Sequence, residues 1–242
     1  MSKLLQQTQD SWGFLLICVA IFALLVNLAW LSERYLIPQK RTLSPARRIS
    51  YIAMFSALAA ILMLFEFPIP FVPSFYKLDF SEIPVLICTL YLGPVAGVIC
   101  ELLKILLDLL IFTGTSTAFV GEFANFFIGC SLILPASVFY HRRKNKKNAI
   151  IGLVIGTLVM TVFGSFFNAF YLIPTYANMY FGEGGLDTIV KMGTAVNSGI
   201  QGVTTLVLFA VVPFNLLKGA LVSTATMLLY KRVERLFFRN KQ

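Results

Sequence analysis

Residues 150–176 read IIGLVIGTLVMTVFGSFFNAFYLIPTY, and no charged residue interrupts them. A helix needs about 20 mostly apolar residues to cross the hydrocarbon core of a bilayer. This stretch is long enough, so it predicts a transmembrane helix. Comparable apolar runs lie on both sides of it, and together they decide the fold class of the chain.

The composition of the whole chain agrees with that prediction. Its 242 residues are 58% hydrophobic and 13% charged, and the mean hydropathy is +0.81. Soluble domains carry roughly a quarter charged residues, so the sequence argues against a soluble enzyme and predicts an all-α integral membrane protein. Four cysteines lie inside apolar runs without metal-ligand spacing, and we expect them to pack as small hydrophobic residues. They are Cys18, Cys88, Cys100 and Cys130.

Seven apolar segments can be delimited, and we expect one extra N-terminal helix followed by a six-helix bundle. The segments are Trp12–Leu31, Ile49–Phe65, Ser81–Leu92, Val95–Phe112, Phe119–Tyr140, Ile150–Tyr176 and Thr194–Tyr230. The last is too long for one simple span, so its ends should include loop and interfacial turn. The implied division is an extra transmembrane helix at 1–34, a basic linker at 35–48, a substrate-binding bundle at 49–236 and a tail at 237–242.

The basic residues predict the orientation of these helices. Fifteen of the twenty Lys and Arg lie in three segments, which the alternation of spans places on one side of the membrane. They are Arg34, Lys40, Arg41, Arg47 and Arg48; Arg142, Arg143, Lys144, Lys146 and Lys147; and Lys231, Arg232, Arg235, Arg239 and Lys241. The positive-inside rule makes that side cytoplasmic. We therefore expect a multi-pass protein of the cell membrane with a cytoplasmic C-terminus, an extracellular N-terminus and no nucleic-acid partner.

The sequence offers little for catalysis. It contains neither the G-x-x-x-x-G-K-[ST] loop that binds ATP phosphates nor a G-x-S-x-G nucleophile motif. Its single histidine, His141, begins a basic loop and has no second histidine or cysteine nearby. We expect no enzyme activity, no metal site and no cofactor.

Polar residues inside apolar segments are costly and are therefore candidates for function. Glu101, Lys104 and Asp108 share one helix face at positions i, i+3 and i+7. A structural ion-pair cluster is the favoured interpretation, and a proton relay is the alternative.

A second polar group lies near the outer ends of several predicted helices. Its members are Asp79, Ser81, Glu82, Glu122, Asn125, Asn168, Tyr171, Asn215 and Lys218. Asparagine amides both donate and accept hydrogen bonds, and aromatic residues accompany them, so the group suits a flat heteroaromatic ligand. Each asparagine could instead join two helices. Lys218 could bind a ligand carbonyl, or pair with a carboxylate such as Asp79 or Glu122.

Four motifs in order resemble the riboflavin-binding S components of energy-coupling factor (ECF) transporters. They are FPIPFVPSFYKLDFSEIP (67–84), LGPVAG (92–97), EFANF (122–126) and VPFNLLKG (212–219). The resemblance implies a six-helix bundle with a riboflavin pocket near the extracellular face, capped by the loop after the first core helix. It also implies docking on a transmembrane coupling subunit that carries two ATP-binding subunits. In that family the bundle is thought to topple in the membrane to release its substrate inside the cell.

By the same resemblance, the ligand-binding residues would be Asn125, Asn215 and Lys218. The capping loop would add Tyr76, Leu78 and Asp79, and Asn168 would join from the fifth core helix. Tyr171, from the polar group described above, completes the expected binding set. Ala53 and Ala57 resemble the small-residue motif that docks the coupling subunit. Two other pairs at the same spacing, Gly93/Gly97 and Gly152/Gly156, permit close helix packing.

The predicted substrate is riboflavin, because its uracil-like edge can pair with amides and an ammonium group. FMN is disfavoured, since a phosphate monoester adds about two negative charges and the predicted outer face is rich in acids. Two alternatives remain open at this stage. One is a proton-coupled secondary transporter that works through Glu101, Lys104 and Asp108. The other is a membrane enzyme acting on a lipid or isoprenoid.

Overall fold

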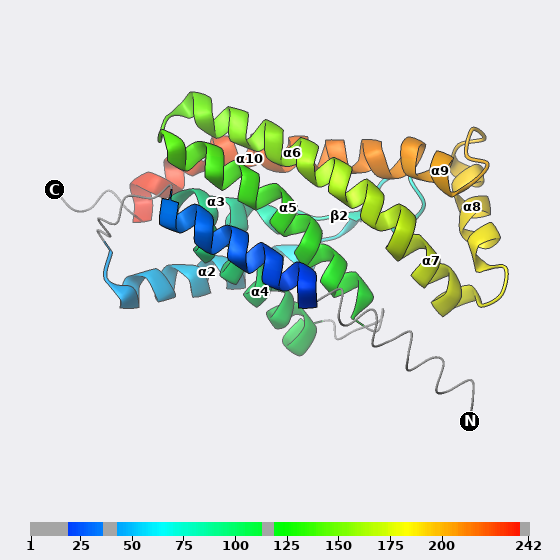
Figure 1. Cartoon of the computed structure of the whole chain (residues 1–242), viewed down its shortest axis with the longest axis horizontal. Helices are drawn as coiled ribbons and strands as arrows, with labels where there is room; N and C mark the ends of the chain where they lie inside the picture. The colour runs from blue at the N-terminus through cyan, green and yellow to red at the C-terminus, as the bar shows by residue number, and fades with distance from the viewer. Residues whose placement is uncertain (1–18, 36–42, 113–118, 238–242) are drawn as a thin grey trace.

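The computed structural model describes residues 19–35, 43–112 and 119–237, and these form an all-α bundle (Figure 1). A helix over 19–35 comes first. It is followed by α2 (Pro45–Met63), α3 (Glu82–Leu92), α4 (Pro94–Leu107) with the π-helical turn η1 (Asp108–Phe112), and α5 (Val120–Arg142). Two short strands, β1 (Phe67–Pro68) and β2 (Lys77–Leu78), pair antiparallel in the loop between α2 and α3.

The second half of the chain contains two long helical segments. The first runs through α6 (Lys146–Phe167), η2 (Asn168–Leu172), α7 (Ile173–Tyr176) and η3 (Ala177–Phe181). A short helix follows, α8 (Gly185–Val196), and the second long segment comprises α9 (Val203–Leu206), η4 (Val207–Val211) and α10 (Val212–Phe237). Four helical segments of the described chain are long and apolar enough to cross a membrane: Pro45–Met63, Val120–Arg142, Lys146–Phe181 and Val203–Val233. The prediction of an all-α membrane protein is confirmed.

The expected last segment, Thr194–Tyr230, is divided in the structure. α8 ends at Val196, and the chain becomes helical again only at Val203. Residues 177–193 fall between the last two predicted segments, but most of them belong to η3 and α8. Gly182 and Gly184 lie between these two helices, and both have positive φ angles. α8 lies across one end of the bundle (Figure 1), where Ile189 packs with Ile200 and Leu206.

Small residues bring neighbouring helices together inside the bundle. A Cβ atom on Gly152 or Gly156 of α6 would collide with the backbone of α5, and one on Gly97 would collide with Thr89 of α3. These glycines therefore permit close packing within the protein. Ala53 and Ala57 differ from them, because both lie exposed on the outer face of α2.

The helix over 19–35 packs against the bundle. Ala29 is buried, and the rings of Phe22 and Phe126 lie 5.5 Å apart. At its other end, Oε1 of Glu33 lies 2.7 Å from Nη2 of Arg48. Oε2 of Glu33 accepts a hydrogen bond of 3.2 Å from the backbone N–H of Val95, in the first turn of α4. The predicted start of this helix at Trp12 lies outside the described residues.

The described parts of the three basic segments gather at one end of the bundle. The end of the first helix, the start of α2, the α5–α6 turn and the end of α10 all lie on the left in Figure 1. Tyr140 and Tyr230, which precede two of the segments, have hydroxyl oxygens 2.5 Å apart. The Pro-rich loop and α8 lie away from this end, so the bundle has one basic pole and one pole rich in loops.

Candidate functional site

A cavity of about 540 Å³ lies beneath the α2–α3 loop. Its volume is within the range of roughly 300–1,000 Å³ that is usual for small-molecule sites. α2, the loop, α3, η1, α5, the α6–α7 segment and α10 all contribute side chains to it. The lining residues are Met63, Glu66, Phe75, Tyr76, Lys77, Asp79, Glu82, Asp108, Gly121, Glu122, Asn125, Ile128, Gly129, Met160, Asn168, Leu172, Tyr176, Phe214, Asn215 and Lys218.

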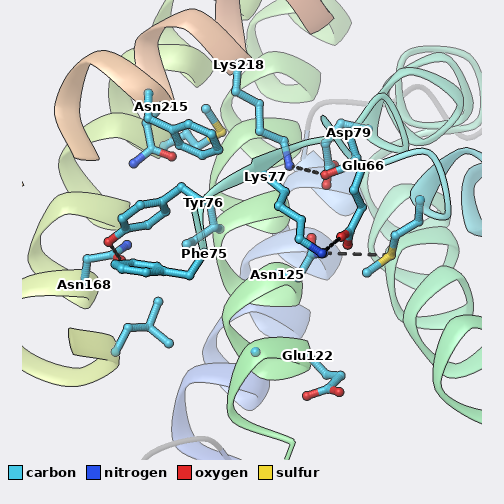
Figure 2. A pocket seen from close by; sticks show the side chains of 18 of the residues that line it. Glu66, Phe75, Tyr76, Lys77, Asp79, Glu122, Asn125, Asn168, Asn215 and Lys218 are labelled. Carbon is cyan, nitrogen blue, oxygen red and sulfur yellow. Dashed lines mark hydrogen bonds and ion pairs between the residues drawn. The ribbon is translucent and has the colours of Figure 1, made fainter. Parts of the chain in front are cut away.

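The α2–α3 loop closes over the cavity through Tyr76 (Figure 2). The Tyr76 hydroxyl donates a hydrogen bond of 2.7 Å to Oδ1 of Asn168, whose Nδ2 donates to the carbonyl of Gly164 at 2.8 Å. The Tyr76 ring also lies 5.5 Å from that of Phe214. Burial raises the pKa of the Tyr76 hydroxyl above its usual range, so the group is a neutral donor. In this closed arrangement, Asn168 already has a protein partner for each end of its amide.

Lys218 reaches from α10 to the end of the same loop (Figure 2). Its Nζ lies 2.7 Å from Oδ2 of Asp79, and both side chains are almost fully buried. Oδ1 of Asp79 accepts hydrogen bonds from the backbone N–H and the hydroxyl of Ser81. Burial opposes ionisation of Asp79, but the ammonium groups of Lys218 and Lys104 outweigh it and hold the pKa of this carboxyl below its usual range. Asp79 thus orients Lys218 and has both oxygens occupied.

The side-chain amides of two asparagines in the cavity lining have few or no close hydrogen-bond partners in the described chain. Asn215 is buried, and its Nδ2 has no hydrogen-bond partner within the described chain. Gly164 provides the space for it, because a Cβ atom there would lie 3.0 Å from that nitrogen. Asn125 makes only long contacts, with Lys104 Nζ 3.5 Å from its Oδ1 and its Nδ2 3.8 Å from Met63 Sδ. A buried donor without a partner is costly, so the Asn215 amide is suited to a ligand. The half-buried Asn125 amide can exchange its long contacts for one as well.

The structure brings six of the eight predicted ligand residues to the cavity: Tyr76, Asp79, Asn125, Asn168, Asn215 and Lys218. Leu78 is buried in β2, and Tyr171 packs against Phe167 at 5.3 Å; neither lines the cavity. Sequence reasoning did not place Ile128, Gly129 or Phe214 in the site. The first two lie three and four positions after Asn125, which is the spacing of one helix face, so this signal was available.

A second cluster of charges adjoins the cavity and shares Glu82 with its lining. Nζ of Lys104 is 2.6 Å from Oε1 of Glu101 and 2.8 Å from Oε1 of Glu82, and all three side chains are buried. The same nitrogen donates a hydrogen bond of 3.3 Å to the Ser81 hydroxyl. Asp108 lies one turn further along and faces the cavity. In the described part of the chain, no group of three or more potential ligands could hold a metal ion.

Comparisons with known proteins agree with this arrangement. Residues 47–230 match the family described as "ECF transporter, substrate-specific component". The riboflavin transporter RibU of Staphylococcus aureus is 36% identical over 81% of this chain and 94% of its own length. The riboflavin transporter FmnP of Bacillus subtilis is 30% identical over 78% of this chain and 92% of its own.

A solved structure of the S component of a bacterial ECF transporter superposes with a TM-score of 0.63 at 36% identity. It is covered completely and accounts for 81% of this chain. The matched family region begins at residue 47, so the helix over 19–35 precedes it. The match covers most of the chain, and sequence and fold agree. The chain belongs to the family of ECF transporter substrate-specific components.

Proposed function

We propose that this chain captures riboflavin at the extracellular side of the cell membrane and delivers it to an energising module. The observation that carries the proposal is the Nδ2 atom of Asn215, a buried donor without a partner in the described chain. It lines the cavity together with the Lys218 ammonium group. The curated relatives reported above are named riboflavin transporters, which supports the same ligand.

The chemistry of the cavity suits a flavin. The carbonyl groups on its uracil-like edge can accept hydrogen bonds from Asn215 and Lys218. Its tricyclic ring would be accommodated by apolar side chains of the lining, among them Met160, Leu172 and Phe214. Asn125 would add a further amide, while Tyr76, Asp79 and Asn168 would shape the cavity from the loop and from η2.

Ligand entry requires the loop to move. The Tyr76–Asn168 hydrogen bond spans the cavity from the loop to η2, so we infer that it breaks when riboflavin enters and that the loop closes again over the ligand. Leu78 and Tyr171 would then act on ligand binding through the loop and the η2 helix.

The chain has no ATP-binding motif, so transport needs partners. We propose that these are a membrane coupling subunit and two ATP-binding subunits, and that Ala53 and Ala57 form part of the docking face. Both alanines are exposed on an apolar helix, where small residues permit close approach of another helix. The basic pole would be cytoplasmic, with the C-terminus there and the N-terminus outside.

Family membership supports the capture subunit and gives no support to a proton-coupled transporter or an enzyme. The packing around Lys104 also has a simpler reading than a proton relay, because its ammonium group lies between two carboxyl groups in a fully buried ion-pair cluster. No cofactor is needed for capture; riboflavin would be cargo.

The test is a titration of the detergent-purified chain with riboflavin, followed by the quenching of flavin fluorescence. We expect saturable binding that weakens about tenfold or more in Asn215→Ala, since a lost hydrogen bond in a buried site costs on the order of 1–3 kcal/mol. Asn27→Ala is the matched control, because Asn27 is exposed and bonds only to its own helix at Ala23. Absence of quenching by the folded chain would overturn the proposal.

A further inference from the structure

Glu82 is a buried acidic residue that lines the cavity, and one of its carboxyl oxygens has no hydrogen-bond partner among the described residues. It is the first residue of α3, and its side chain is 2% exposed. Oε1 pairs with Lys104, whereas Oε2 has no hydrogen-bond partner among the described residues. Buried polar atoms in native proteins nearly always have a partner. Oε2 of Glu101 is unpaired as well, but only Glu82 lines the cavity, so a ligand there can supply the missing partner to Glu82.

Two carboxyl groups share one ammonium group in this cluster, and they differ in their position relative to the cavity. The shared ammonium group is that of Lys104, which pairs with Glu82 and Glu101. Glu82 lies at the positive end of the α3 dipole. Glu101 lies in the middle of α4 and does not line the cavity. Of the two acids paired with Lys104, Glu82 is thus the one that lines the cavity.

Helix α5 leaves space for the Glu82 side chain. A Cβ atom on Gly129 of α5 would lie 3.1 Å from Oε1 of Glu82 and would overlap Glu101. Gly129 therefore leaves room for both carboxyl groups around Lys104. With Oε1 fixed by the ion pair, Oε2 is the oxygen left for a further hydrogen bond.

The helices around the cavity supply different polar groups. α10 supplies the donors Asn215 and Lys218, the latter paired with Asp79 of the loop, while α3, η1 and α5 supply the acidic residues Glu82, Asp108 and Glu122 together with the Asn125 amide. Figure 2 shows Asn215 and Lys218 well apart from Glu122. Donors complement carbonyl groups, and carboxylates complement hydroxyl groups. A ligand with a carbonyl-bearing ring and a polyhydroxyl chain would satisfy both regions.

We infer that Glu82 accepts hydrogen bonds from the hydroxyl groups of the ligand's polyol chain, with Lys104 as its positioning residue, and that it makes the site selective for flavins carrying such a chain. This inference rests on the proposed function. It assigns to Glu82 a contact with the polyol chain of the ligand, whereas the α10 residues are assigned to its ring.

The experiment compares two ligands on the purified chain. Riboflavin carries the polyol chain; lumiflavin has the same ring with a methyl group in its place. We expect Glu82→Gln to weaken riboflavin binding about tenfold, because hydrogen bonds to charged groups are roughly twice as strong as neutral ones. Lumiflavin binding should change by less than about twofold. Glu101→Gln is the matched control, since it alters the other acid on Lys104 without reaching the cavity, and both ligands should bind it as they bind the unmodified chain.

The affinities of the two ligands show whether Glu82 contacts the polyol chain or only packs in the wall of the cavity. Unchanged riboflavin affinity in Glu82→Gln, or equal weakening of both ligands, would overturn the inference and leave Glu82 a packing residue. If the unmodified chain bound neither flavin, the proposed function itself would fail. Thermal unfolding checks that the variants are folded. Should Glu82→Gln not purify as a folded protein, Glu82→Leu serves instead, because it leaves Lys104 paired with Glu101 and must show the same selective loss of riboflavin.

Discussion

The hydroxyl group of Tyr76 lies 2.7 Å from Oδ1 of Asn168, and 92 positions separate the two residues in the chain. This contact joins the α2–α3 loop to the η2 turn of the long α6–α7 segment. Both residues line the cavity. Removing this hydrogen bond therefore tests whether it keeps the loop closed.

Tyr76→Phe removes this hydrogen bond and keeps the ring that packs near Phe214. A net hydrogen bond contributes about 0.5–1.5 kcal/mol, so we expect riboflavin to dissociate roughly threefold to tenfold faster from the variant. Stopped-flow measurement of flavin fluorescence after dilution gives this rate. Tyr35→Phe is the control, because Tyr35 is 78% exposed on the first helix. An unchanged dissociation rate would show that the contact does not hold the loop.

Asp79→Asn tests the ion pair with Lys218 through its dependence on pH. The pKa of Asp79 is below its usual range, so its contribution to stability is fully present above the unfolded value of about 3.9. It is lost as pH falls through the lower pKa of the folded state. Asp79→Asn should therefore lower the unfolding temperature by a constant amount between about pH 5 and 8, with a smaller difference below about pH 4. A difference that grows toward low pH would contradict this assignment.

FMN should bind at least about tenfold more weakly than riboflavin. Five acidic residues line the cavity (Glu66, Asp79, Glu82, Asp108 and Glu122), against the two lysines Lys77 and Lys218. The phosphate of FMN adds about two negative charges at neutral pH, and like charges in a partly buried site repel strongly. Competition of FMN against bound riboflavin, followed by fluorescence, measures the ratio. Equal affinity would mean that the phosphate remains outside the cavity.

Ala57→Leu tests the outer face of α2 as a docking surface. A larger side chain on this exposed face should leave riboflavin binding by the isolated chain unchanged, because Ala57 does not line the cavity. It should reduce riboflavin uptake severalfold in cells that contain the complete transporter, since close helix packing depends on small residues. Val154→Leu, at an exposed position of α6, is the control. Normal uptake by Ala57→Leu would move the docking surface elsewhere.

Much of the fold follows from the sequence for a simple physical reason. A helix in a bilayer must satisfy its own backbone and show apolar side chains to lipid, so runs such as 150–176 can be read directly. α8 escaped this reasoning because it lies across the end of the bundle and buries mainly Ile189 and Gly193. Its first residue follows Gly182 and Gly184, whose positive φ angles end η3 and which in sequence resemble an ordinary loop.

The site was predictable in part. Asn215 and Lys218 stand out because polar residues are costly in an apolar run, and six of the eight expected ligand residues do line one cavity. Their partners were harder to infer: Lys218 had two candidate carboxylates, and the structure selects Asp79, 139 positions away. Which atoms remain unpaired, such as Oε2 of Glu82, depends on distances that a linear pattern does not contain.

The helix over 19–35 has a practical consequence. Glu33 fixes one end of it to Arg48 and to the first turn of α4, and Phe22 packs on Phe126 nearer the other end. Since both ends are attached, this helix must reorient together with the bundle whenever the bundle tilts. A fluorophore or spin label on its exposed side, for example at Leu24, would therefore report the angle of the whole subunit to the bilayer normal. It would do so without touching either the cavity or the exposed alanines of α2.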